Sequence, residues 1–155
     1  MRAKPNLPQS QIVIREIDAE AIFATAMTLL AKQGREGKAL TWLTAAAEAG
    51  HLEAQFNLGI LYTMGDVVPY DAQMAFFWIR QAAHGGMARA QYWLARCHMT
   101  GDIAEQSFAE AYRWSVAAHA QGFPDTGIIR AAAGERLSAA ERREIDSAAT
   151  AGTQA

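Results

Sequence analysis

The stretch AQFNLGILYTMGD at residues 54–66 returns 36 residues later as AQYWLARCHMTGD at residues 90–102. Both copies begin with Ala-Gln, keep a leucine at the fifth position and end with Gly-Asp. Three tryptophans keep the same spacing, at Trp42, Trp78 and Trp114. Chance does not hold so many positions in one register, so the chain contains an internal repeat with a period of 36 residues.

Small residues recur at the same spacing around the tryptophans. They explain why so much of a chain of 155 residues is alanine. Two antiparallel helices approach closely only where side chains are small, so these columns predict the contact between the helices of a hairpin. The columns are Ala39, Ala75 and Ala111; Ala46, Ala82 and Ala118; and Gly50, Gly86 and Gly122.

Each repeat is predicted to be a pair of helices. In the second repeat the apolar residues of 54–64 and of 71–84 fall at helical spacing. Gly65 is expected to end the first helix, and Asp71 to cap the second. In the third repeat Ser107 and Glu110 have the spacing of a capping box. The tryptophans are expected to fill the space between neighbouring hairpins.

These residues resemble the Sel1-like repeat, a helical hairpin slightly longer than the tetratricopeptide unit. The resemblance covers about residues 18–133. It rests on residues 54–62 with Gly65, Val68, Asp71, Ala75, Trp78, Ala82, Ala83 and Gly86, and on their counterparts. The third repeat departs from it, with His98 in the place of Tyr62 and Ala104 in the place of Val68. The resemblance implies an all-α, right-handed solenoid of about three helix-turn-helix repeats that serves as an adaptor or scaffold without catalysis.

The ends are expected to differ from the repeats. Residues 1–17 are predicted to be a partly mobile tail, with a segment folded back on the solenoid as the alternative. The solenoid is predicted to span residues 18–133, and Asp18 is expected to begin its first helix. Ser138 and Glu141 form a second capping box, which starts a polar helix. A solenoid needs such an element over its last apolar face, so residues 134–155 are predicted to be a capping helix and a frayed end.

Composition excludes several classes of function. The formal net charge is −2 and the basic residues are scattered, which gives no electrostatic footprint for nucleic acid or a membrane surface. No stretch has the roughly 18 apolar residues of a membrane span, and no signal peptide is recognisable. With one cysteine, nothing indicates an oxidising compartment. We expect a cytoplasmic protein; a periplasmic protein trimmed of its signal is the alternative.

Histidine and cysteine side chains raise the question of a metal-dependent or histidine-based enzyme. Cys97 and His98 are adjacent, and His98 and His119 replace a tyrosine and an alanine of the other repeats. A buried, hydrogen-bonded histidine pair is the preferred interpretation, since no spacing supplies further zinc ligands. His51 is expected to be a solvated turn residue. The sequence therefore predicts no catalytic residue, metal or cofactor.

The candidate binding site is the concave face of the solenoid, lined by the first helix of each hairpin. Aromatic, methionine and arginine side chains off the core columns are what interface cores favour. The alternative is that Phe56 and Tyr92 pack against the neighbouring hairpin. The predicted partner-binding residues are Phe56, Asn57, Ile60, Met64, Tyr92, Trp93 and Arg96.

These observations favour a non-enzymatic adaptor or scaffold whose concave groove binds a peptide or helix of another protein. The alternative function is an inhibitor or immunity protein that neutralises a cognate bacterial toxin, a role of some bacterial members of the family. A monomer is expected, with a weak dimer through the first hairpin as the alternative.

Overall fold

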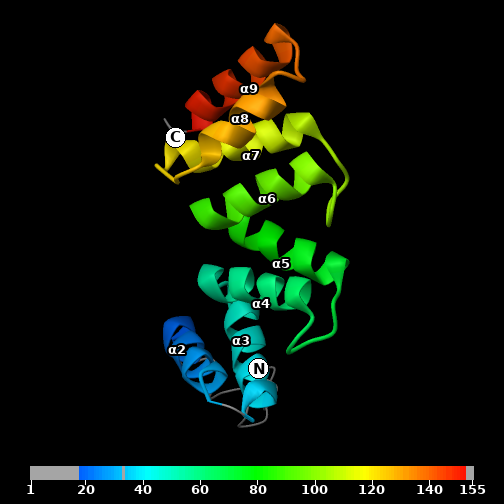
Figure 1. The fold of residues 1–155 in the computed structure, drawn as a ribbon. Coiled ribbons are helices and arrows are strands. Elements are labelled where there is room, and N and C mark those ends of the chain that lie inside the picture. Colours follow the sequence, from blue (N-terminus) through cyan, green and yellow to red (C-terminus); the bar gives the residue numbers. More distant parts are fainter. Residues whose placement is uncertain (1–17, 33, 153–155) are drawn as a thin grey trace, which may run out of the picture.

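The computed structural model describes residues 18–32 and 34–152, and in this part of the chain it contains eight helices and no strand. The predicted tail at 1–17 lies outside the described residues. The helices, labelled as in Figure 1, are α2 (Ala19–Leu30), α3 (Glu36–Glu48), α4 (Leu52–Met64), α5 (Ala72–His84), α6 (Ala88–Thr100), α7 (Phe108–Ala120), α8 (Thr126–Gly134) and α9 (Ala139–Gly152).

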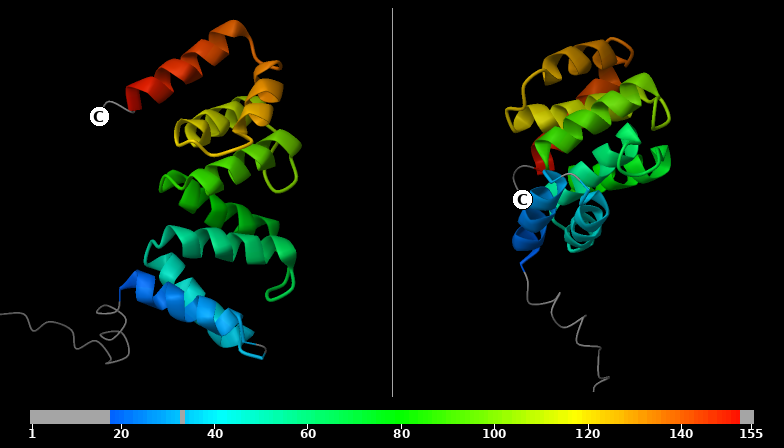
Figure 2. Two further views of the ribbon diagram at one scale, coloured as in Figure 1. Left: turned by 60° about the vertical axis from the view of Figure 1, so that its left-hand side comes forward. Right: turned by 60° about the horizontal axis from the view of Figure 1, so that its bottom comes forward.

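The first six helices form three hairpins, α2–α3, α4–α5 and α6–α7, which stack one after another (Figure 1). Successive hairpins meet where the second helix of one contacts the first helix of the next, as α3 contacts α4 and α5 contacts α6. The helices α8 and α9 follow at the end of the stack, where both contact α7 (Figure 2). The predicted all-α solenoid of three hairpins with a C-terminal helix is confirmed.

Alanine columns hold the helices of each hairpin together. All six alanines of the two columns are completely buried, as the spacing predicted. A close approach occurs at Gly59 of α4, which lies against Ile79 of α5. Because an added methyl group would collide there, the small residues fix how near the two helices come.

Trp78 lies between neighbouring hairpins and is only 8% exposed. It packs with Leu43 of the first hairpin and Leu58 of its own. Trp114 is half-buried and contacts apolar residues of both the second and the third hairpin. The predicted role of the tryptophans is therefore confirmed at both positions.

The recurring Ala-Gln pair ties consecutive hairpins together. The buried amide of Gln55 donates to the carbonyl oxygen of Ala47 over 3.0 Å. Its counterpart Gln91 donates to the carbonyl oxygen of Ala83 over 3.2 Å. Each glutamine therefore adds a second hydrogen bond to a carbonyl in the last turn of the preceding helix, which also accepts from the N–H of Gly50 or Gly86.

The predicted helix caps are confirmed, with one correction. Asp71 accepts hydrogen bonds from the backbone N–H groups of Gln73 and Met74, and Gly65 ends α4 in the left-handed conformation. Ser107 accepts from the N–H of Glu110. The reciprocal half of the predicted capping box is missing, because the N–H of Ser107 donates to the carbonyl oxygen of His98 instead.

The C-terminal helix begins at a complete capping box. The N–H of Ser138 donates to the carboxylate of Glu141, and the N–H of Glu141 donates to Oγ of Ser138. Ile145 is buried against α7, with Leu137 beside it. These contacts are the docking that the sequence predicted for the end of the solenoid. Among the described residues, no helix is long and apolar enough to cross a membrane.

Candidate protein-binding face

The predicted binding residues lie on α4 and α6, the first helices of the second and third hairpins. We call the surface formed by α2, α4 and α6 the first-helix face. Side chains on this face meet across hairpins: the carboxylate of Glu53 on α4 forms an ion pair with the guanidinium of Arg89 on α6. The face is therefore continuous from one hairpin to the next.

Phe56 faces into the protein. Its side chain is 4% exposed and packs with Ala82, Ala83 and Leu94. The guanidinium of Arg89 lies 4.5 Å from the centre of its ring. The alternative interpretation, packing against the neighbouring hairpin, thus describes Phe56, and its ring is not available to a partner.

Tyr92, the counterpart of Phe56 one repeat later, is half-buried. Its ring lies 5.2 Å from the ring of Phe123, measured between centroids. It also packs against the apolar cluster around Tyr112 and Ile129. Tyr92 therefore connects the third hairpin to the segment before α8 and offers only part of its ring to solvent.

Trp93 and Arg96 form a stacked pair on α6. The guanidinium of the exposed Arg96 lies 5.0 Å from the centre of the Trp93 ring. A cation over an indole face is attracted by its quadrupole, which restricts the arginine side chain. Among the described residues, no carboxylate lies within ion-pair distance of Arg96. Arg96 is therefore a pre-oriented cation without a counter-ion.

Asn57, Ile60 and Met64 are the other predicted binding residues on α4. Met64 is 60% exposed, and Ile60 is half-buried against the cluster that holds Phe56. The amide of Asn57 contacts Sδ of Met27 on α2 at 3.9 Å. Met27 itself is 40% exposed. The sequence analysis missed Met27, because the repeat pattern is weakest in the first helix.

His51 is another residue whose role the sequence analysis missed. The prediction of a solvated turn residue is wrong: Nδ1 of His51 caps α4 by accepting from the N–H of Ala54. Its Nε2 lies 2.8 Å from a carboxylate oxygen of Glu20, and its ring stacks on Phe23 at 4.5 Å. His51 thus joins the first hairpin to the second. Its position just before the first helix of a repeat was the available signal.

The histidines of the third repeat do not form a pair. Nδ1 of His98 is hydrogen-bonded to the carbonyl oxygen of Glu105. His119 is exposed, and its Nδ1 is hydrogen-bonded to Oγ1 of Thr126. The prediction of one buried pair is therefore wrong, although each ring has a hydrogen-bond partner. Within the described residues, no group of three or more His, Cys, Asp or Glu side chains is placed to hold a metal ion.

Cys97, on α6, is buried. Burial raises the pKa of its thiol to about 11, because the thiolate would lose its hydration. The thiolate is the nucleophilic form of cysteine, so a thiol with this pKa is inert near neutral pH. Cys97 is a packing residue.

Comparison with known proteins agrees with this geometry. The sequence model of the Sel1 repeat matches residues 35–51, 52–87 and 88–123. No curated protein sequence matches the chain significantly.

Several solved structures, including the following two, are similar to the chain. One is c5321, a protective antigen present in uropathogenic Escherichia coli strains that displays an SLR fold. It is 27% identical with a TM-score of 0.73, and the match covers 85% of this chain but 29% of c5321. The other is a Sel1 repeat protein from Oxalobacter formigenes, 28% identical with a TM-score of 0.70. That match covers 79% of this chain and 98% of the Oxalobacter protein.

Proposed function

Because the chain belongs to the Sel1 repeat family, we propose that it is a non-enzymatic adaptor that binds a peptide or helix of another protein along its first-helix face. Sel1 repeat solenoids are generally protein-interaction scaffolds without catalytic activity. The proposal adds to this the surface that binds and the residues that contact the partner.

The observation that carries the proposal is the pair of Trp93 and Arg96. An exposed guanidinium held over an aromatic ring has lost part of its conformational freedom before a partner arrives, which lowers the cost of binding. Arginine and tryptophan are also the residues most often found to dominate binding energies at interfaces. The apolar side chains of Met27, Ile60 and Met64 offer further contact area on the first-helix face.

A partner that fits this face carries a carboxylate for Arg96 between apolar side chains. The Glu53–Arg89 ion pair neutralises the neighbouring charges, so Arg96 supplies the unbalanced charge between α4 and α6. A helix would present such groups on one side, at spacings of three and four residues. A toxin inhibitor, the alternative function, would use the same binding chemistry with a toxin as its partner.

The test is partner recovery with matched charge reversals. Wild-type protein and the variants Arg96→Glu and Arg80→Glu are used as bait, and each recovered partner is then purified for titration. Arg80 is an exposed arginine on α5 outside the first-helix face, so its reversal controls for net charge. We expect Arg96→Glu to weaken binding at least tenfold and Arg80→Glu to leave it unchanged. Equal affinity of the two variants would overturn the assignment of the face.

A further inference from the structure

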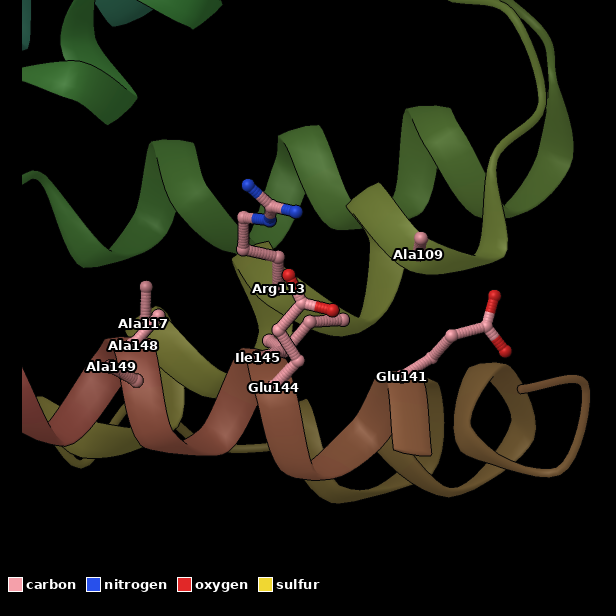
Figure 3. A pocket seen from close by; sticks show the side chains of 8 residues that line it. All are labelled: Ala109, Arg113, Ala117, Glu141, Glu144, Ile145, Ala148 and Ala149. Carbon is pink, nitrogen blue, oxygen red and sulfur yellow. The ribbon is translucent and has the colours of Figure 1, made fainter. Parts of the chain in front are cut away.

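A groove lies between α7 and α9, at the end of the solenoid away from α2. Its volume is about 450 Å³. The helix α9 contacts α7 through buried Ile145 and through Asp146, which accepts a hydrogen bond from the hydroxyl of Tyr112. Side chains from both helices line the groove beside this contact (Figure 3).

The wall of this groove is mostly methyl groups. Ala109 and Ala117 contribute from α7, and Ala148 and Ala149 contribute from α9, with Ile145 between them. Short side chains on both helices allow a third chain segment to approach the backbones closely. The alanine columns inside the hairpins provide the same kind of contact.

The charges around the groove are mainly negative. Arg113 is the cation, and it lies 3.7 Å from the carboxylate of Glu110. Glu141 and Glu144 add two carboxylates from α9 (Figure 3). Glu141 is engaged by Ser138, whereas no ion pair of Glu144 occurs in the described part of the chain. Among the lining residues, two carboxylates against one guanidinium leave one negative charge, so an occupant should be apolar and basic.

Residues 1–17 of the same sequence have this chemistry. They contain the apolar run Ile12-Val13-Ile14, followed directly by Arg15. Their three basic residues, Arg2, Lys4 and Arg15, outnumber the single acidic Glu16 by two. The segment therefore matches both the apolar wall and the net charge of the groove.

We propose that the α7–α9 groove binds residues 1–17 of a second copy of this chain, with Ile12-Val13-Ile14 on the alanine wall and Arg15 at Glu144. The segment of the same copy cannot serve. Ile14 precedes Asp18 by four residues, which span at most about 14 Å. The groove is lined by α7 and α9, and α4 and α6 separate these helices from α2 in the stack (Figure 1).

Such a contact joins two different surfaces, so it is heterologous. A heterologous contact extends into chains of copies unless its rotation closes a ring. The small groove offers limited area, so the association should be weak and should increase with protein concentration.

The binding test uses a fluorescently labelled synthetic peptide of residues 1–17, titrated with the full chain and followed by fluorescence anisotropy. Ala148→Phe fills the groove, and Glu144→Lys reverses its unpaired charge. Ala140→Phe and Glu48→Lys make the same changes at exposed positions outside the groove. We expect saturable binding that weakens at least tenfold in the two groove variants and stays within twofold in the two controls. A peptide carrying Arg15→Glu should recover affinity for Glu144→Lys.

Two further measurements make the result decisive. Thermal unfolding of each variant shows that the solenoid is intact, and sedimentation velocity shows whether self-association of the full chain is lost in Ala148→Phe. Arg96→Glu should leave peptide binding unchanged, so this proposal and the adaptor function fail separately. Absence of saturable peptide binding, or equal affinity of groove and control variants, would overturn the proposal.

Discussion

Gly59 of α4 and Ile79 of α5 fit together so closely that a Cβ at Gly59 would stand 2.6 Å from Cγ1 of Ile79 and 3.1 Å from the carbonyl oxygen of Ala75. In the next repeat the same two positions hold Ala95 and Ser115, both completely buried. The second helix therefore carries a smaller side chain there, serine in place of isoleucine, and the first helix carries an extra methyl group, alanine in place of glycine. This exchange of volume leads to the first two predictions.

Gly59→Ala should destabilise the protein. Alanine is the better helix former by about 1 kcal/mol, but overpacking a tight contact costs about 1–3 kcal/mol. We expect a net loss of about 1 kcal/mol in the free energy of unfolding, measured by urea denaturation. Gly37→Ala is the control, because Gly37 is also helical and has nothing within 4 Å of its added Cβ. That variant should be as stable as the wild type or more so; equal effects of the two changes would contradict the prediction.

Ile79→Ser should partly relieve the strain of Gly59→Ala. Alone, Ile79→Ser removes a completely buried side chain, at a cost of about 2–5 kcal/mol. The double variant recreates the Ala95–Ser115 arrangement, so it should be more stable than the sum of the single effects by about 1 kcal/mol. The measurement is a double-mutant cycle of unfolding free energies. Additive effects would contradict the exchange of volume between positions 59 and 79.

Asp71→Ala should destabilise α5 at its first turn. The carboxylate accepts two backbone hydrogen bonds there, and loss of such a cap costs about 1 kcal/mol. Asp66→Ala removes an exposed carboxylate from the same interhelical loop and is the matched control. Thermal unfolding of the three proteins compares them. If Asp66→Ala lowered stability as much as Asp71→Ala, the effect would come from loop charge and not from capping.

Cys97 should react with iodoacetamide only slowly in the folded protein. With a pKa of about 11, roughly one thiol in 10,000 is a thiolate at pH 7. The alkylation rate, followed by mass spectrometry, should keep rising above pH 9 in native buffer. In denaturant the rate should be higher and should level off near the ordinary thiol pKa of about 8.5. A native rate that levels off at the same pH as the denatured rate would refute the inert, buried thiol.

Acid should loosen the start of α9. Hydrogen bonds from Ser138 lower the pKa of the Glu141 carboxyl below its usual value. A carboxyl with a lowered folded pKa contributes stability above its unfolded pKa and loses it as the pH falls through the folded pKa. The amide signal of Ser138 should therefore shift as the pH is lowered through this range, measured by NMR. Ser138→Ala should weaken this dependence; an unchanged pH profile would exclude the capping box as its source.

The repeat made most of the fold predictable. Trp78, the alanine columns, Asp71 and Gly65 lie where their spacing placed them, because each is determined by contacts that recur every 36 residues. Local spacing was less reliable at Ser107. Its backbone N–H, which a capping box needs, donates to the carbonyl oxygen of His98 instead. Periodicity therefore predicts what every hairpin shares, and misses what a single neighbour changes.

The binding face was only partly predictable for the same reason. The helical period identified residues off the core columns, but it could not tell which of them the next hairpin covers. Phe56 is covered by α6, whereas Arg96 is exposed because it stacks on Trp93 within its own helix. His51 was missed because its cap and its contacts with Phe23 and Glu20 arise only when two hairpins meet.

The ion pair between Glu53 and Arg89 joins two residues of one repeat column, exactly one period apart along the chain. Because this column holds opposite charges, the second and third repeats differ at a position where they contact each other. A tandem duplication of residues 52–87 would place glutamate beside glutamate at this point, and a duplication of 88–123 would place arginine beside arginine. The column therefore disfavours two copies of the same hairpin side by side, because a copied hairpin would meet like-charge repulsion from its original.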